Sequence, residues 1–242
     1  MSGKNKTVSA AEVFGQAVND FYRQNKIQDI IVQANHFADD KIPVDYLFRN
    51  FEEMPELEQI ALKKATGKIL DVGACAGSHS LALQDLGENV TAIDLSEKTV
   101  ETCQERGVKN ALVCDFFDLE NQQFDTLLLL MNGSGIVGKF SQLPNFFKQL
   151  KNLLSPKGQV LLDSSDLRYL YSEEELVDFY DNQIYFGDFQ YKLRYKNLHS
   201  EKFNWLYIDF QTLTSAAEQY GFKTEFLFVG ENDEFLARLE LA

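Results

Sequence analysis

The sequence predicts an α/β fold: a doubly wound, mostly parallel sheet with N-terminal helices and an inserted β-hairpin. Two observations support this prediction. Between residues 67 and 163, short apolar runs alternate with amphipathic runs, and glycines follow several of the amphipathic runs. Strands and helices that alternate in this way form βαβ units, whose right-handed crossovers build a parallel sheet. Beyond residue 183 the pattern changes to a strict alternation of apolar and polar residues, which is typical of a hairpin.

Residues 1–66 are predicted to form a tail and a helical cap, and residues 67–242 the main domain. Apolar residues recur at helical spacing from Ala10 to Asn25, which predicts an amphipathic helix. A second helical stretch is expected from about Val44 to Ala65, interrupted near Met54 because Pro55 restricts the residue before it. The N-terminal third is therefore expected to be helical.

The central part of the chain supplies the predicted parallel strands. Its apolar run from Asp125 to Met131 has almost no polar interruption, as expected of a central strand covered on both faces. A turn is expected at residues 155–158. The other predicted strands are Lys68–Val72, Asn89–Asp94, Ala111–Cys114 and Gln159–Asp163, and the helices are Ser78–Leu86, Glu97–Arg106 and Leu143–Leu154.

The C-terminal part departs from this alternation. Ser172 and Glu175 have the spacing of a capping box that begins a short helix. An inserted hairpin segment is expected at about residues 183–210, with a polar turn near residues 197–200. A helix at residues 213–220 and a closing hairpin at residues 224–229 and 234–241 complete the predicted domain.

Composition and charge exclude several classes of protein. The 37 acidic and 23 basic residues give a net charge of −14, which argues against a nucleic-acid groove because such grooves gather Lys and Arg. The three Cys and three His are scattered, so neither a disulfide framework nor a metal site is expected. The longest apolar run, Leu127–Met131, is far too short to cross a membrane, and the N-terminus lacks a signal-peptide core. A cytoplasmic location is the resulting expectation.

Acidic residues end three successive predicted strands. The first, Asp71, leads into a loop that contains Gly73 and Gly77 and precedes a helix. Glycines there allow close backbone approach, and the free N–H groups of a helix start suit an anionic group. Asp94 lies 94 − 73 = 21 residues after Gly73, near the distance at which an acid reaches ribose hydroxyls. Asp115 ends the third strand, so the set predicts a ligand that contains adenosine.

Two common nucleotide-binding patterns do not match. A dinucleotide fold places glycines at positions one, three and six of the loop, but these positions are Gly73, Cys75 and Ser78. No Gly-Lys-Ser or Gly-Lys-Thr follows a strand either, which excludes a P-loop. A nicotinamide-dependent oxidoreductase is therefore disfavoured.

From Gly67 to Asp163 the chain resembles the class I S-adenosylmethionine-dependent methyltransferases. The resemblance rests on the acidic-x-Gly-x-x-x-Gly loop, the later strand-end acids and the strand that ends at Asn132; Cys75 departs from the family pattern, which has a glycine there. It implies a Rossmann-like, seven-stranded sheet with an antiparallel last strand, and S-adenosyl-L-methionine as cofactor. The family's loop residues would lie against the methionine portion, Asp94 would hold the ribose, and Asp115 with Phe116 the adenine. The implied cofactor-binding residues are Asp71, Gly73, Ala74, Gly77, Asp94, Leu95, Asp115, Phe116, Met131 and Asn132.

The sequence says less about the residues that would hold the methyl acceptor. No catalytic residue is identified, and His79 is expected to be a packing or surface residue. The candidate acceptor-pocket residues are Arg49, Asp166, Tyr169 and Tyr207. The chemistry implied is in-line displacement, in which the protein supplies alignment, water exclusion and, where the acceptor carries a proton, a base.

The preferred function is methyl transfer to a small-molecule acceptor. Neither a membrane nor a nucleic acid is expected as a partner. The alternatives are a protein or RNA acceptor, which would require a local basic groove, and a non-catalytic S-adenosylmethionine-binding protein. A groove of this kind would form around Lys192, Arg194, Lys196 and Lys202. The sequence leaves three roles open for the inserted hairpin: a lid, a sheet extension or the interface of a homodimer.

Overall fold

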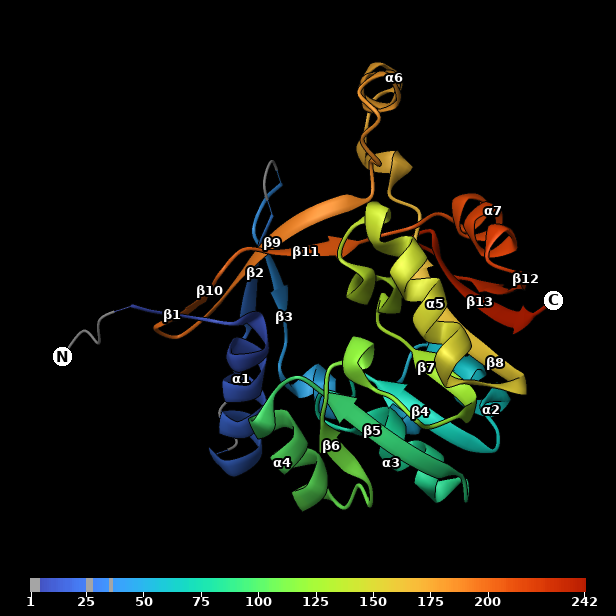
Figure 1. The fold of residues 1–242 in the computed structure, drawn as a ribbon. Coiled ribbons are helices and arrows are strands. Elements are labelled where there is room, and N and C mark those ends of the chain that lie inside the picture. Colours follow the sequence, from blue (N-terminus) through green and yellow to red (C-terminus); the bar gives the residue numbers. More distant parts are fainter. Residues whose placement is uncertain (1–4, 25–27, 35–36) are drawn as a thin grey trace. The chain divides into compact units, whose positions relative to one another are not determined.

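The computed structural model describes residues 5–24, 28–34 and 37–242. The chain forms two compact units, each built from discontinuous segments (Figure 1). The first unit comprises Met1–Pro55, Lys68–Leu119 and Gln190–Phe203, and the second comprises Glu56–Gly67, Glu120–Phe189 and Asn204–Ala242. The predicted division between residues 66 and 67 follows the order of the sequence, and it stays a prediction.

The first unit contains the three parallel strands that the strand-end acids follow. These are β4 (Lys68–Val72), β5 (Asn89–Asp94) and β6 (Ala111–Val113), in the order β4-β5-β6. Helix α3 (Ser78–Asp85) follows β4, and helix α4 (Glu97–Arg106) follows β5. Side chains such as Ala92, Val100 and Val108 form a buried cluster between helix and strands, as the apolar runs predict.

The second unit contributes the remaining strands of the main sheet. Strand β7 (Phe124–Leu129) is parallel to β8 (Leu154–Ser165), whereas β13 (Glu234–Leu241) is antiparallel to both β8 and β12 (Phe222–Val229). The complete order is β12-β13-β8-β7-β4-β5-β6, a seven-stranded sheet. The helices of this unit are α2 (Glu56–Lys64), α5 (Leu143–Leu153), α6 (Glu173–Asp181) and α7 (Phe210–Gln219). The predicted mostly parallel sheet with an antiparallel last strand is confirmed.

Strand β8 is longer than predicted. The expected turn at residues 155–158 lies within it, where the pairing with β7 loses its regular register between Phe124 and Thr126. A side chain at Gly158 would lie 3.0 Å from the carbonyl oxygen of Phe124, so glycine allows the close approach of the two strands. The turn-forming residues therefore make an irregularity inside the strand.

A second sheet corrects the prediction that the N-terminal third is helical. That third contains strands β1 (Lys6–Val8), β2 (Ile30–Ala34) and β3 (Asp40–Ile42) besides helix α1 (Ala10–Gln24). They join β9 (Asp188–Tyr195) and β10 (Leu198–Ser200) in the order β1-β10-β9-β2-β3, and β11 (Phe203–Leu206) is a further strand of this sheet. We call it the accessory sheet. Strand β1 pairs with β10, where Lys6 and Leu198 are 198 − 6 = 192 residues apart, and β2 pairs with β9, where Ile31 and Arg194 are 194 − 31 = 163 residues apart. Sequence periodicity does not report such distant partners.

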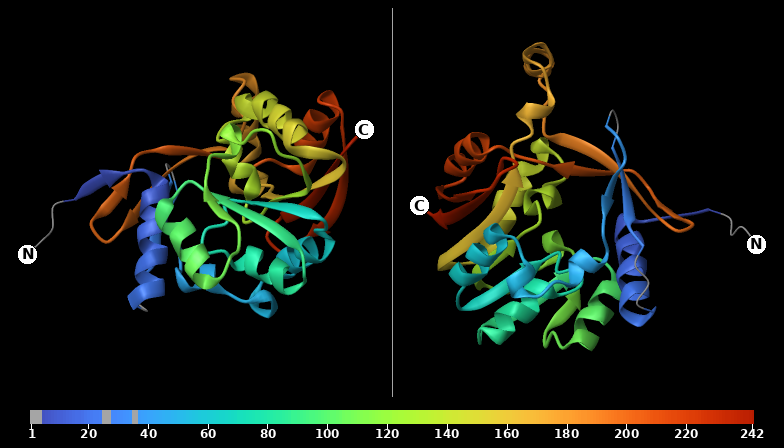
Figure 2. Two further views of the ribbon diagram at one scale, coloured as in Figure 1. Left: turned by 60° about the horizontal axis from the view of Figure 1, so that its bottom comes forward. Right: turned by 180° about the vertical axis from the view of Figure 1, so that it is seen from behind.

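One face of the accessory sheet packs on α1, which runs beside β2 and β3 (Figure 2). Val13 and Ala17 of α1 are fully buried against Ile30, Leu193 and Tyr195. The stretch predicted as a second helix is divided into two 3-10 turns, η1 (Asp45–Phe48) and η2 (Phe51–Glu53), followed by α2. The interruption before Pro55 is confirmed. In the described ranges, no helix has the length and hydrophobicity needed to span a bilayer.

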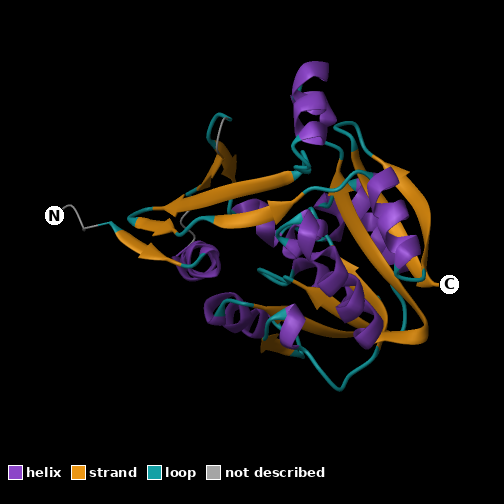
Figure 3. Cartoon of the chain, turned by 45° about the horizontal axis from the view of Figure 1, so that its top comes forward, coloured by secondary structure: helices purple, strands orange, loops and turns teal. Residues whose placement is uncertain are grey.

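The predicted capping box at the start of α6 is present: the Glu175 amide donates to Ser172 Oγ (3.2 Å), and the Ser172 amide donates to Glu175 Oε2 (2.8 Å). Figure 3 shows that α6 stands apart from the other helices of its unit, and none of its residues is buried. The cap therefore sets where this helix begins, while packing contributes little to it.

Candidate functional site

The loop that joins β4 to α3 adopts the backbone that its glycines permit. Gly73 and Gly77 have φ of +73° and +81°, in the left-handed region. At Gly77 a side chain would also meet Val108 Cγ2 at 2.8 Å and Cys103 Sγ at 3.0 Å. At Gly73 a side chain would have no heavy atom within 4 Å, so space is open beside the loop. The loop therefore offers its backbone to a ligand at Gly73 and packs tightly at Gly77.

Cys75 keeps the left-handed backbone although it is not a glycine, with φ of +50°. Its amide donates to Asp94 Oδ2 at 3.0 Å, and its carbonyl accepts from Cys103 Sγ at 3.0 Å. These two bonds hold the conformation that a side chain disfavours. Burial raises the pKa of the Cys75 thiol far above its usual range and that of Cys103 to about 12, so both thiols keep their protons at neutral pH.

Asp71 lies inside the fold at the end of β4. Its carboxyl is 2% exposed and accepts a 2.6 Å hydrogen bond from Ser80 Oγ on α3. Burial raises the pKa of this carboxyl, while His79 nearby and the hydrogen bonds from Ser80 act against the rise. Asp71 therefore joins the first turn of α3 to the strand and fixes the geometry of the loop between them.

Asp94 lies at the end of β5, where it contacts two loops at once. Oδ2 accepts from the Cys75 amide at 3.0 Å, and Oδ1 accepts from the Ser96 amide at 2.9 Å. Burial raises the pKa of this carboxyl, and the backbone donors oppose the rise. The Leu95 amide and the Thr99 side chain also donate to this carboxyl. The next residue, Leu95, is 60% exposed, which is unusual for a leucine beside a buried strand end.

Asp115 and Phe116 follow β6. Asp115 Oδ1 accepts from the Phe117 amide at 2.9 Å, and the amide of Cys114 donates to the carbonyl of Asp94 at 3.0 Å. The ring of Phe116 is 2% exposed, whereas Phe117 is 37% exposed and packs edge-on against it at 5.2 Å. Sequence reasoning did not select Phe117, although an aromatic pair after a strand-end acid was visible.

The N-terminal segment of the first unit covers the outer side of this loop. Ser78 Oγ donates to the carbonyl of Leu47 at 2.8 Å, and Leu47 and Val18 form a buried cluster with Ala76. Arg49 is 6% exposed, donates to the Tyr46 carbonyl at 2.6 Å and lies over the Tyr46 ring at 4.1 Å. Its charge is close enough to lower the pKa of the Cys75 thiol against the effect of burial.

In the second unit, two consecutive residues after β7 have left-handed backbones. Met131 and Asn132 have φ of +64° and +59°, and Met131 is 36% exposed. Ser165 Oγ donates to Asn132 Oδ1 at 2.8 Å, and the Gly133 amide donates to Asp163 Oδ1 at 2.8 Å. Strained backbone that is held by the neighbouring strand is often found at functional sites. The end of β8 thus fixes the end of β7.

The glycines after Asn132 serve packing inside the second unit. A side chain at Gly135 would lie 1.8 Å from the Trp205 ring, so only glycine fits beneath the indole. Ser134 Oγ donates to the Leu206 carbonyl at 2.8 Å and hydrogen-bonds Ser164 Oγ at the same distance. The segment at residues 133–135 is therefore a fixed 3-10 turn between two elements.

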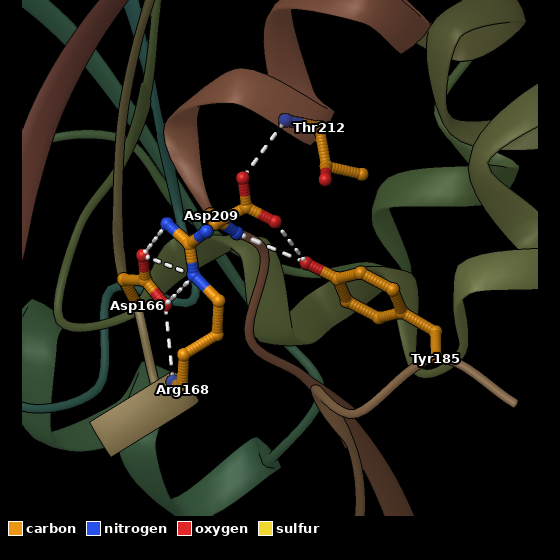
Figure 4. Close-up of polar contacts among 5 residues, drawn as sticks. All are labelled: Asp166, Arg168, Tyr185, Asp209 and Thr212. Carbon is orange, nitrogen blue, oxygen red and sulfur yellow. Dashed lines mark hydrogen bonds and ion pairs between the residues drawn. The ribbon is translucent and has the colours of Figure 1, made fainter. Parts of the chain in front are cut away.

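The residues proposed for the acceptor side lie on segments beyond β8. Asp166 accepts from Arg168 Nε at 2.9 Å and from its amide at 3.0 Å (Figure 4). Although burial acts to raise it, the hydrogen bonds from Arg168 bring the pKa of Asp166 below its ordinary value. Tyr169 is 61% exposed, and the ring of Tyr207 packs edge-on against Phe189 at 5.3 Å.

Tyr185 is a residue of this region that sequence reasoning missed. Its hydroxyl donates to Asp209 Oδ2 at 2.9 Å and accepts from the Asp209 amide at 3.0 Å (Figure 4). Asp209 Oδ1 in turn accepts from the Thr212 amide and caps α7. Burial raises the pKa of Tyr185 far above its usual range. The tyrosine therefore fastens the segment after α6 to the start of α7.

The structure brings the candidates together in two sets. The loop residues, Asp94 and the Arg49 segment share the first unit, linked through Cys75 and Ser78, and β6 brings Asp115 beside them. The second unit holds the candidates from Met131 onward: Met131, Asn132, Asp166, Tyr169 and Tyr207. Among the described residues, no group of three or more His, Cys, Asp or Glu could hold a metal ion.

Comparison with known proteins points to one family. The family described as "Methyltransferase domain" matches residues 70–162. An S-adenosylmethionine-dependent methyltransferase from Bacteroides fragilis, solved with S-adenosyl-L-homocysteine, is 45% identical with a TM-score of 0.88 over 99% of both chains. An uncharacterized methyltransferase of Staphylococcus carnosus is 26% identical over 58% of this chain and 66% of its own length. The methyltransferase CcbJ from Streptomyces caelestis shares the fold, with 13% identity and a TM-score of 0.62 over 95% of this chain and 98% of its own.

Proposed function

The chain belongs to the class I S-adenosylmethionine-dependent methyltransferases, and we propose that its methyl acceptor is a small molecule. The cofactor of the family is S-adenosyl-L-methionine, and the loop and strand ends of the first unit fit it. Gly73 leaves open space, the Asp94 carboxylate ends β5 and is hydrogen-bonded to the loop at Cys75, and Leu95 is exposed beside it. We assign the ribose hydroxyls to Asp94 and an apolar contact to Leu95.

The remaining residues of the proposed cofactor site would contact the methionine portion and the adenine. Asp71 would hold the loop in place through Ser80, because its carboxyl lies inside the fold, and Gly73, Ala74 and Gly77 would present the backbone. Asp115 has one carboxylate oxygen engaged by the Phe117 amide, which leaves the other for an exocyclic amine. We propose that Phe117, with its exposed ring, contacts the adenine more directly than the buried Phe116.

S-adenosylmethionine supplies the transferable methyl group and a thioether leaving group when it is bound. The role of the protein is then to align the reacting groups and to exclude water. Met131 and Asn132 are suited to alignment, because β8 holds this segment through the Asn132 side chain and the Gly133 amide. Asp166 stays ionised at neutral pH next to Arg168, which makes it a weak base. We therefore propose that Asp166 binds and orients the acceptor and does not take its proton.

The observation that carries the small-molecule proposal is the charge of the acceptor-side segment. Residues 166–189 contain one cation, Arg168, and seven carboxylates: Asp166, Glu173, Glu174, Glu175, Asp178, Asp181 and Asp188. A polyanion such as RNA would be repelled by this segment. Its aromatic side chains include Tyr185, whose ring stacks on Phe140 at 4.6 Å. An aromatic and acidic surface suits a small acceptor with an amine or hydroxyl group.

Methyl-labelled S-adenosylmethionine, supplied with a cell extract divided into metabolites and macromolecules by ultrafiltration, tests the proposal. We expect labelled products in the metabolite fraction, and we expect Asp94→Ala to abolish them. Label in protein or RNA would instead establish a macromolecular acceptor. Cofactor binding without labelled product in either fraction would favour a binding protein.

A further inference from the structure

The outer face of the accessory sheet is polar and basic in a strongly acidic chain. Register places Thr7 opposite His199, His199 opposite Arg194, and Gln33 opposite Lys192, on neighbouring strands. Residues that pair across strands point to the same face of a sheet. The alternate residues, such as Leu193 and Tyr195, form the core on the opposite face. The polar residues therefore share one surface across β1, β10, β9 and β2.

A cavity of about 510 Å³ opens on this face. This volume lies within the range of about 300–1,000 Å³ that is typical of small-molecule sites. The lining combines lysines and a histidine with several uncharged hydrogen-bonding groups and one acid. It consists of Asn5, Thr7, Gln33, Lys192, Leu193, His199, Ser200, Glu201 and Lys202.

Several cations of the first unit form ion pairs. Lys6 pairs with Glu12, Arg23 with Glu101 and Glu105, Lys41 with Asp29, and Lys196 with Asp20. Lys192 and Lys202 form no ion pair with any carboxylate in the described ranges, and neither does Arg194 beside the cavity. Since 37 acidic residues compete for 23 cations, unpaired lysines at one cavity leave a local positive charge for a ligand.

From this arrangement we infer a second binding site, which takes a small organic molecule with a compact dianionic group such as a phosphate monoester. Lys192 and Lys202 supply the charge, and the Asn5 and Thr7 side chains can hydrogen-bond the rest of the molecule, together with Gln33 Oε1, since Gln33 Nε2 donates to Asp39 Oδ2 at 3.1 Å. The bounded volume favours a metabolite over a nucleic-acid strand, which would follow a longer basic track. The site does not depend on the proposed acceptor.

Isothermal titration at low salt with ribose 5-phosphate, citrate and uncharged ribose tests the inference. We expect ribose 5-phosphate to bind, ribose not to bind, and added salt to weaken the binding. Binding of citrate as well would extend the site to carboxylates. Absence of ribose 5-phosphate binding at millimolar concentration, or binding of an RNA oligonucleotide alone, would overturn it.

Charge variants assign the binding to this cavity. The double variant Lys192→Glu/Lys202→Glu should weaken ribose 5-phosphate by more than about tenfold, because it reverses two charges at the ligand. The double variant Lys64→Glu/Lys148→Glu, on α2 and α5 of the other unit, makes the same change in net charge and should leave the affinity unchanged. Equal losses in both variants would mean a general charge effect and would refute the site.

Glu201→Gln should change the affinity for ribose 5-phosphate in the opposite direction. It removes the one carboxylate in the lining, so ribose 5-phosphate should bind about two- to fivefold more tightly, the scale of one exposed charge pair. Weaker binding would show that the cavity prefers a cationic group. Unchanged affinity for S-adenosyl-L-homocysteine in each variant verifies that the fold is intact, and it keeps this test separate from the methyltransferase proposal.

Discussion

At the scale of single residues, Cys75 shows how a departure from a family pattern is tolerated. Its backbone has the left-handed φ of +50° that a glycine would adopt freely, and hydrogen bonds with Asp94 and Cys103 hold it. The sequence could show that the glycine is missing, and it suggested a less open loop. It could not show that the backbone conformation is kept, because this depends on contacts across the loop.

Two variants separate backbone strain from the loss of the thiol. Cys75→Ala keeps the strained backbone, whereas Cys75→Gly relieves it; both remove the side chain. We expect the glycine variant to have a free energy of unfolding about 1 kcal/mol higher than the alanine variant, because the left-handed penalty exceeds the extra chain entropy of glycine. Urea denaturation measures both. An alanine variant that is as stable as the glycine variant would contradict a strained Cys75.

The buried carboxyl of Asp71 predicts a pH dependence of stability. Burial raises its pKa, so the folded chain keeps the proton at pH values where the unfolded chain has released it. This contribution to stability is fully present below the ordinary range of aspartate, and it is lost as pH rises through the raised pKa. Asp71→Asn keeps an acceptor for Ser80 and carries no charge.

The stability of Asp71→Asn relative to the unmodified chain should therefore increase as pH rises from acid to neutral. Urea denaturation at several pH values measures the difference, with Asp85→Asn at the end of α3 as a control that should change little. A difference that is constant or that shrinks with rising pH would show that the Asp71 pKa is not raised.

At the scale of elements, the Tyr185–Asp209 pair fastens the segment that contains α6. Tyr185→Phe removes a donor from a carboxylate that is 4% exposed and an acceptor from the Asp209 amide. We expect a loss of about 2 kcal/mol in the free energy of unfolding, since buried partners are left unsatisfied. Proteolysis within residues 171–188 should also become faster.

Tyr180→Phe provides the matched control, because its side chain is 83% exposed on α6. It should change neither stability nor proteolysis. If both variants behaved alike, the hydrogen bonds of Tyr185 would not be what holds this segment.

The elements also show which parts of the fold were predictable. Strands β4 to β8 and their helices follow from local periodicity, and the helix caps at Ser96, Ser172 and Asp209 lie where the residue type favours them. Strands β1 and β2 were missed because they pair with β10 and β9 of the distant inserted segment, and β3 was missed with them because it pairs with β2. The role of Tyr185 was missed for the same reason: its partner lies 24 residues further along the chain.

At the scale of the whole molecule, the net charge of −14 conceals opposite local charges. The acceptor-side segment is acidic, and the outer face of the accessory sheet has unpaired lysines. The total charge disfavours a nucleic-acid substrate, which stays an expectation, and it gives no indication of the basic cavity. Lys192 and Lys202 were noticed in the sequence, but their position around one cavity required the strand register.

We propose that the strand-end acids hold the cofactor, with Asp94 on the ribose hydroxyls. Titration of S-adenosyl-L-homocysteine and of NAD into the unmodified chain and into Asp94→Ala, followed by calorimetry and thermal unfolding, tests this most directly. We predict one site for S-adenosyl-L-homocysteine, a stabilisation of about 2.7 kcal/mol at a hundred times Kd, no effect of NAD, and at least about tenfold weaker binding in the variant. Binding of NAD alone, or an unchanged affinity in Asp94→Ala, would contradict the account.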